Sequence, residues 1–381
     1  MNFTAEELAD KLSAHLTQPT AKALAKDLLR EFSYSTLEIL EEAEGLSISL
    51  EDIKDFDDLN KIFRDAYENL LKRQGKKPET AKATHTQSLI SPIDKLSQVL
   101  FDKRKNPVFY EDPLDPEVAI RVGKKRGKPV SILVAVNIDK LKPFIAFDTE
   151  AMLDPFNRAV HDAAISLFNA GNTHISPDMI YHVMNGYRRN DKAPAEARKA
   201  INQAMSKLMY TGIKIDATEE AKAFGIENFK FEGYLMPVTY ALAKINGQEV
   251  ECWKILDEPP LLTLAGRKGQ INKSPVNLLD TGLSFTPDNI VITNYLLEQI
   301  LTMQNPNSNR NNVILYDTVY DYLCVDAPTA NALKQRKSKI RDKVKVILDA
   351  WVKADFISGY DELLEGRKIR GLYIKYKKQS S

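Results

Sequence analysis

The chain has little cysteine, because Cys252 and Cys324 are the only two among its 381 residues. Two cysteines do not imply a disulfide framework or a cysteine zinc site, and a reducing cytoplasm is the simplest setting for them. The sequence also lacks an apolar run of about 18 residues, the length that a membrane-spanning helix requires. Its first residues lack the basic and apolar regions of a signal peptide. We therefore expect a cytoplasmic protein that makes no use of a membrane.

Signatures of catalysis are also missing from the sequence. The stretch 269–274 ends like a phosphate-binding loop, but Asn272 stands where a glycine should precede the lysine. Three histidines, His161, His174 and His182, fall in one region without the His-x-His pair of a rolling-circle nuclease. These histidines are more ordinarily interpreted as side chains packed in the core than as ligands of a zinc ion. We therefore expect a protein that is not an enzyme and that needs no metal or cofactor.

The net charge of +1 conceals an uneven distribution of charge along the chain. Residues 1–73 carry 16 acidic and 9 basic side chains, a net charge of −7, so the remaining residues carry +8. Such asymmetry indicates an acidic interaction module joined to a basic part that meets a polyanion, although chance unevenness is the alternative. Apolar residues at helical spacing in residues 1–73 predict a small all-α module for docking or oligomerisation. The polar stretch 74–89 has no apolar period and predicts a linker.

Residues 90–256 predict a first folded domain that carries an N-terminal β-hairpin extension. The extension follows a short helix, Ile93–Phe101, and its strands are Glu117–Val122 and Val130–Val136. Helix caps and glycine stops then predict three helices, which are Phe156–Asn169, Asp178–Asn185 and Ala195–Tyr210. An Asn-Gly turn predicts a second hairpin, from the strands Tyr234–Lys244 and Glu249–Leu256.

The same order of elements recurs after a connector at residues 257–285. Within residues 286–381 the patterns predict helices at Asp288–Met303, Val313–Val325 and Ala330–Trp351, followed by short strands at Phe356–Tyr360 and Arg370–Tyr376. Three helices followed by a hairpin is the order of a winged helix. The expected fold is therefore helix-rich α+β, with two tandem winged-helix domains after the small all-α module.

The third helix of each predicted domain carries polar and basic side chains away from its apolar stripe. In the C-terminal helix the stripe includes Leu333, Ile340, Val344 and Ile347. A one-signed helix face followed by a basic hairpin favours DNA binding, and a merely solvated amphipathic face is the alternative. The candidate DNA-binding residues in the C-terminal helix are Lys334, Gln335, Lys337, Ser338, Arg341 and Lys345. The candidates in the wing are Arg367, Lys368 and Arg370, and those in the first domain are Arg198, Lys199, Asn202 and Ser206.

Several stretches resemble the theta-type, iteron-binding replication initiators of plasmids and related mobile elements. They are Leu153–Phe168, Ala200–Leu208, Ile213–Asp216 and Ile340–Tyr376, and the resemblance covers roughly residues 145–376. It implies that the C-terminal unit reads repeated double-stranded DNA sites in the major groove. It further implies that the N-terminal unit contacts phosphates and supports a homodimer. The resemblance does not extend to residues 1–145, but for an initiator of this kind we expect the acidic residues 1–73 to recruit a host helicase or helicase loader.

Two other functions fit the same units. One is a winged-helix transcriptional regulator or partition-type DNA-binding protein, and the other is an interaction protein that uses winged helices to dock other proteins. Direct repeats beside an AT-rich tract would favour initiation, whereas an inverted repeat over a promoter would favour regulation.

Overall fold

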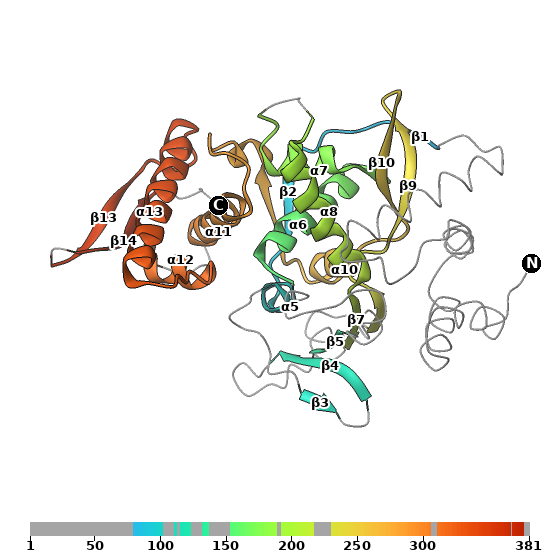
Figure 1. Ribbon diagram of the computed structural model, residues 1–381, viewed down its shortest axis with the longest axis horizontal. Coiled ribbons are helices and arrows are strands. Elements are labelled where there is room, and N and C mark those ends of the chain that lie inside the picture. The colour runs from blue at the N-terminus through green and yellow to red at the C-terminus, as the bar shows by residue number, and fades with distance from the viewer. Residues whose placement is uncertain are drawn as a thin grey trace, which may run out of the picture.

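The computed structural model describes a mixed α+β chain (Figure 1). The described residues are 79–101, 110–112, 115–122, 132–136, 153–188, 192–216, 230–305, 311–366 and 368–376. The predicted all-α module at residues 1–73 and the wing residue Arg367 lie outside these ranges. Within the described residues, no helix combines the length and the hydropathy needed to cross a bilayer.

The first half of the structure begins its helices at the predicted caps. The Asp154 carboxylate accepts from the backbone N–H of Asn157 at 2.8 Å, and the Asn157 side chain accepts in return from the Asp154 N–H at 3.0 Å. This reciprocal cap fixes the start of α6. The elements of this half are α6 (Pro155–Asn169), β6 (His174–Ile175), α7 (Pro177–Met184), α8 (Ala195–Tyr210), β9 (Val238–Ile245) and β10 (Gln248–Ile255).

The predicted Asn-Gly hairpin is confirmed. Asn246 and Gly247 join β9 to β10, with φ angles of 50° and 86°. A two-residue turn with positive φ at both positions matches the twist of the flanking strands. β6 pairs with the other edge of β10, and a parallel strand, β1 (Glu79–Ala81), covers the free edge of β9, so the sheet order is β1-β9-β10-β6.

The second half repeats this arrangement. Its elements are α11 (Pro287–Gln304), β12 (Val313–Leu315), α12 (Tyr316–Tyr322), α13 (Ala330–Lys353), β13 (Gly359–Glu365) and β14 (Lys368–Lys375). The sheet order is β12-β14-β13. In both halves the strand that precedes the second helix pairs with the last strand of the hairpin. The predicted helix Val313–Val325 is wrong at its start, because Val313–Leu315 pairs with β14 and the helix begins only at Tyr316.

Two further sheets pack against elements of the first half and the connector. The predicted connector is folded: it contains α10 (Pro260–Arg267), β11 (Ile271–Pro275) and the 3-10 turn η4 (Val276–Leu279). β11 pairs with β2 (Ser88–Pro92), which leads into α5 (Lys95–Leu100). The predicted hairpin extension belongs to a five-stranded antiparallel sheet made of β3 (Tyr110–Asp112), β4 (Asp115–Val122), β5 (Ile132–Val136), β7 (Gly212–Asp216) and β8 (Lys230–Tyr234).

The prediction of a linker at residues 74–89 is wrong from Glu79 onward. We call residues 79–87 the strap, because they run from the edge of β9 to β2 (Figure 1). Asn172 accepts from the N–H of Thr84 at 2.7 Å and donates to the Thr84 carbonyl at 2.9 Å. The Tyr187 hydroxyl accepts from the N–H of Thr86 at 3.1 Å. Side chains distant in sequence thus satisfy the backbone of a stretch that has no apolar period.

The strap packs on a small cluster that contains a buried thiol. Ala81 and Ala83 contact the cluster formed by Ala241, Ala243, Ile245 and Cys252, and Cys252 is 1% exposed. Burial raises the pKa of the Cys252 thiol to about 12. A thiol that is both covered and protonated reacts slowly with alkylating reagents.

Cys252 should therefore report the opening of the strap. In a Cys324→Ser background, Cys252 should resist alkylation at pH 8, and Asn172→Ala should accelerate its alkylation by roughly tenfold or more, because two strap hydrogen bonds of about 1 kcal/mol each are lost. Alkylation followed by mass spectrometry measures the rate, with Asn277→Ala as a matched amide control. An unchanged rate in Asn172→Ala would show that the strap does not shield the thiol.

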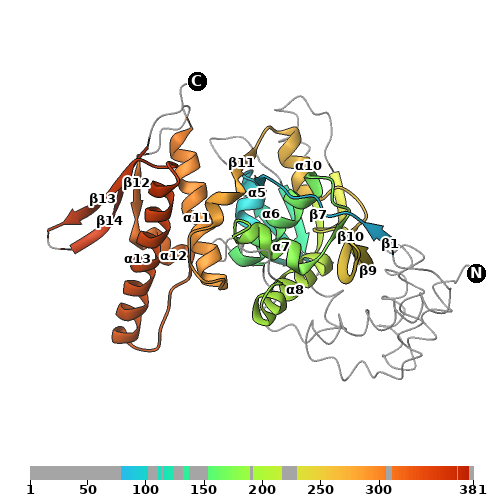
Figure 2. The same ribbon diagram turned by 90° about the horizontal axis from the view of Figure 1, so that it is seen from above.

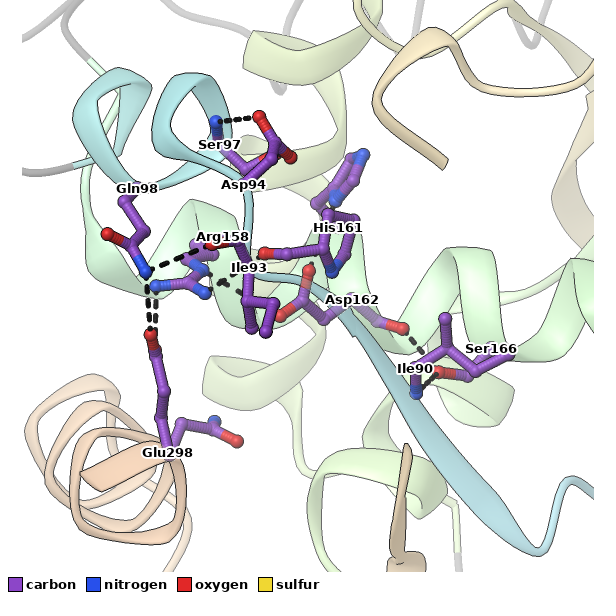
Figure 3. A network of polar contacts seen from close by, with 12 residues as sticks. Ile90, Ile93, Asp94, Ser97, Gln98, Arg158, His161, Asp162, Ser166 and Glu298 are labelled. Carbon is purple, nitrogen blue, oxygen red and sulfur yellow. Dashed lines mark hydrogen bonds and ion pairs between the residues drawn. The ribbon is translucent and has the colours of Figure 1, made fainter. Parts of the chain in front are cut away.

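An ion pair between a buried arginine and a half-buried glutamate joins the two halves (Figure 3). On α6, Arg158 places Nη1 2.9 Å from Glu298 Oε2 of α11, and its Nε lies 3.9 Å from Asp162 Oδ2. Its Nη2 also donates to the carbonyl of Pro92 at the end of β2. Burial alone would lower the pKa of Arg158, but the carboxylates of Glu298 and Asp162 outweigh burial and raise the pKa. Arg158 therefore stays charged and holds α6, β2 and α11 together.

Removing Arg158 should cost more stability than neutralising Glu298. Arg158→Met leaves two carboxylates without their cation and should lower the free energy of unfolding by about 3–5 kcal/mol. Glu298→Gln should cost less, because Asp162 still compensates the guanidinium. Urea unfolding can be followed separately in each half, since Trp253 and Trp351 are buried in different halves.

Two single-tryptophan backgrounds, Trp253→Phe and Trp351→Phe, allow each half to be read alone. Asp361→Ala is the control, because its ion pair with Lys375 is solvent-exposed and screened, and it should cost less than about 1 kcal/mol. If Arg158→Met and Asp361→Ala lowered the free energy of unfolding by equal amounts, the Arg158–Glu298 ion pair would not hold the two halves together.

Candidate nucleic-acid interface

The first turns of α13 project from the body of the protein. The buried side chains of this helix begin at Ile340, and residues 330–339 contribute none. Figure 2 shows this end of α13 extending beyond α11. Thr329 caps the helix, because its hydroxyl accepts from the N–H of Ala332 at 3.2 Å. The projecting part is therefore a capped helix on which no side chain before Ile340 is buried.

This projecting part is strongly basic. No acidic residue occurs between Ala330 and Arg341. Among the predicted residues, Lys334 and Gln335 are exposed, whereas Lys337, Ser338, Arg341 and Lys345 are half-buried. Two cations that were not predicted, Arg336 and Lys339, are exposed on the same turns. Cations grouped on a projecting helix create the positive potential that attracts a polyanion.

Tyr320 of α12 contacts the projecting turns of α13 at Lys337. Its hydroxyl donates to the carbonyl of Lys337 at 3.3 Å, and the Lys337 Nζ lies 4.9 Å from the centre of its ring. Tyr316 stacks on Tyr320 with ring centres 6.1 Å apart. Burial raises the pKa of Tyr320, and Arg341 opposes this shift, so the guanidinium acts on the same tyrosine pair. Helical periodicity in α13 gave no sign of this support, because it comes from another helix.

The β13–β14 hairpin, which the sequence predicts to be a wing, has less free positive charge than expected. Three of its acids neutralise bases: Lys345 Nζ lies 2.6 Å from Glu362, Lys375 Nζ lies 2.6 Å from Asp361, and Arg370 pairs with Glu365. Lys368 is exposed, and within the described residues it makes no ion pair. Among the described residues of the β13–β14 hairpin, Lys368 is thus the predicted DNA-binding residue whose charge is least neutralised.

Helix α8 offers fewer groups than α13. Arg198 places Nη2 3.1 Å from Asp178, whose carboxylate also accepts from the N–H of Ala193 at 2.9 Å. Lys199 is exposed and Asn202 is half-buried. The prediction for Ser206 is wrong, because this side chain is 0% exposed where α8 packs against its neighbours α6, α7 and β8. The Arg198 guanidinium mainly fixes α8 to α7.

Two of the three histidines, His161 and His174, are buried and contact carboxylates. His161 is fully buried, with Nδ1 3.3 Å from Asp162, and His174 places Nε2 3.2 Å from Glu79 of the strap. Burial lowers the pKa of His174 and outweighs the opposing effect of Glu79. Within the part of the chain that the structure describes, no group of three or more His, Cys, Asp or Glu side chains could hold a metal ion.

Comparison with family models, curated proteins and solved structures gave no match to the chain. Support for a function therefore comes from α13 and the elements around it.

The dependence of α13 on Tyr320 can be measured directly. Tyr320→Leu removes the hydroxyl and the ring and should speed amide hydrogen exchange in residues 333–341, where no side chain before Ile340 is buried. Exchange in residues 344–351 should stay slow, because Val344, Ile347 and Trp351 remain buried. Tyr320→Phe keeps the ring, so its exchange rate in residues 333–341 should lie between those of the wild type and Tyr320→Leu. Uniformly faster exchange along α13 would instead mean that Tyr320 supports the whole core.

Proposed function

We propose that the protein is a sequence-specific, double-stranded DNA-binding replication initiator of a plasmid or related mobile element. The observation that carries the proposal is the capped, projecting and one-signed beginning of α13. A helix of about 10–12 Å diameter fits the major groove of B-DNA. The proposed activity is binding and assembly at an origin, and it requires no covalent chemistry from the chain.

We also propose that each half is a winged-helix unit. The repeated order of helices and the repeated sheet pattern, β12-β14-β13 and β6-β10-β9, support this interpretation. In such a unit the third helix enters a groove and the hairpin lies along the backbone. By this correspondence α13 and α8 are the two candidate reading helices, and the β13–β14 and β9–β10 hairpins are the wings.

The two units have different tasks in this proposal. α13 has exposed basic and amide side chains along its projecting turns, so the second unit reads base edges. In α8, Arg198 is engaged by Asp178 and Ser206 is buried, so the first unit supplies phosphate contacts and positions the second. Contacts to phosphate fix register without reading sequence. The acidic residues 1–73 would recruit the host helicase or its loader.

Arg341 and Lys368 should affect DNA binding differently. Arg341→Ala should cost about 1–3 kcal/mol on the specific site and little on random duplex, because a guanidinium can make two hydrogen bonds to guanine. Lys368→Ala should weaken binding to both duplexes alike and reduce the salt slope by about one unit. Binding isotherms across a salt series measure both effects. If the two variants behave identically on both duplexes, α13 is not the reading element and α8 becomes the better candidate.

The kind of site separates initiation from regulation. Capture of genomic and plasmid DNA at moderate salt, followed by sequencing, should recover direct repeats beside an AT-rich tract. Recovery of inverted repeats over promoters would favour a transcriptional regulator instead. Binding that does not weaken with salt would argue against a DNA-binding function altogether.

A further inference from the structure

Four polar residues form a ridge along the outermost side of α13. They are Asn331, Gln335, Ser338 and Asp342, at spacings of four, three and four residues. At 100° per residue these spacings keep all four side chains on one helix face. That face is opposite the face of Ile340, Val344 and Ile347, which is buried against the body. We refer to these four residues as the ridge.

The ridge is open for recognition. Asn331, Gln335 and Asp342 are exposed and Ser338 is half-buried. Within the described residues, none of the four side chains takes part in a hydrogen bond or an ion pair, in contrast to Lys345 and Arg336 on the flanks. The ridge spans 11 residue steps, or about 16 Å at 1.5 Å per residue. That length matches about five base pairs at 3.4 Å each.

We propose that the ridge adds to the guanine contact of Arg341 a second set of base contacts, and that these select adenine and cytosine. This inference rests on the proposed function and assigns base-reading roles to Asn331 and Asp342 in addition to Gln335 and Ser338. An amide side chain matches adenine, because its oxygen accepts from N6 while its NH₂ donates to N7. A carboxylate accepts from the N4 amino group of cytosine. Ser338 has a hydroxyl that fits either kind of edge and adds little selectivity.

Asp342 gives the most discriminating part of the proposal. Its carboxylate lies on a helix whose neighbouring side chains, Lys339, Arg341, Lys343 and Lys345, are cationic. Toward phosphate this charge is unfavourable, so Asp342 weakens binding to random duplex. Facing a cytosine amino group, the same carboxylate gains a charge-assisted hydrogen bond. Asp342 therefore raises specificity by penalising wrong sites as well as by stabilising the right one.

The test begins with selection of duplexes from a random library by the full chain. The wild type should select a core of about five base pairs that includes adenines and a cytosine. Asn331→Ala and Gln335→Ala should each lose the preference at one adenine and bind the selected site about 5- to 150-fold more weakly. Replacing that adenine by 7-deaza-adenine should weaken the wild type but not the matching variant, since the N7 acceptor is already unused.

Asp342→Ala should act in opposite directions on the two kinds of DNA. Its affinity for random duplex should rise, and its preference at the cytosine position should disappear. Asn277→Ala, an exposed amide on η4, is the control and should select the same sequence as wild type. If the ridge variants still select the wild-type sequence, the ridge is not the reading surface although DNA binding stands. If the wild type shows no salt-dependent binding to any duplex, the proposed DNA-binding function itself is wrong, and the ridge proposal falls with it.

Discussion

The pairing of Arg158 with Glu298 is the contact on which the arrangement of the two halves depends. It lies where α6, β2 and α11 meet, and the Pro92 carbonyl and Gln98 extend it into a polar network. Apolar packing has little orientational preference, whereas a guanidinium fork accepts its partners only in a fixed geometry. Trp351 adds a second directional link, because its indole donates to the Leu278 carbonyl at 2.7 Å. The direction in which α13 projects from the first half follows from these contacts.

Local signals in the sequence were sufficient to predict most of the helices and the β4–β5 and β9–β10 hairpins. Asp154-Pro155, Ser176-Pro177 and Thr286-Pro287 start α6, α7 and α11 as predicted, because a cap and the residue that follows it act within one turn. The Asn246-Gly247 turn is equally local. Features that depend on distant partners escaped prediction. β12 is only three residues long and is defined by β14, and the strap depends on Asn172 and Tyr187, about 90 to 100 positions away.

The residues of the candidate interface also divide into those that local periodicity placed correctly and those whose surroundings depend on other elements. Periodicity placed Lys334, Gln335 and Arg341 away from the buried stripe of α13, and the structure keeps them there. Periodicity alone misplaced Ser206, because α8 is covered by neighbours on more than one side and has no single buried stripe. It also could not show that Glu362 and Glu365 neutralise Lys345 and Arg370, since ion pairs between elements require the folded arrangement.

The position of β1 has a mechanical consequence. β1 lies on the outer edge of β9, at the end of the molecule away from α13 and the β13–β14 hairpin in both views (Figures 1 and 2). Because β1 is hydrogen-bonded alongside β9, a pull on the chain before Glu79 along the strands would load several hydrogen bonds together, as in shear. A pull directed across the strands would instead break the β1–β9 hydrogen bonds one at a time. The strap would thus transmit force to the folded body in one direction and yield in the other.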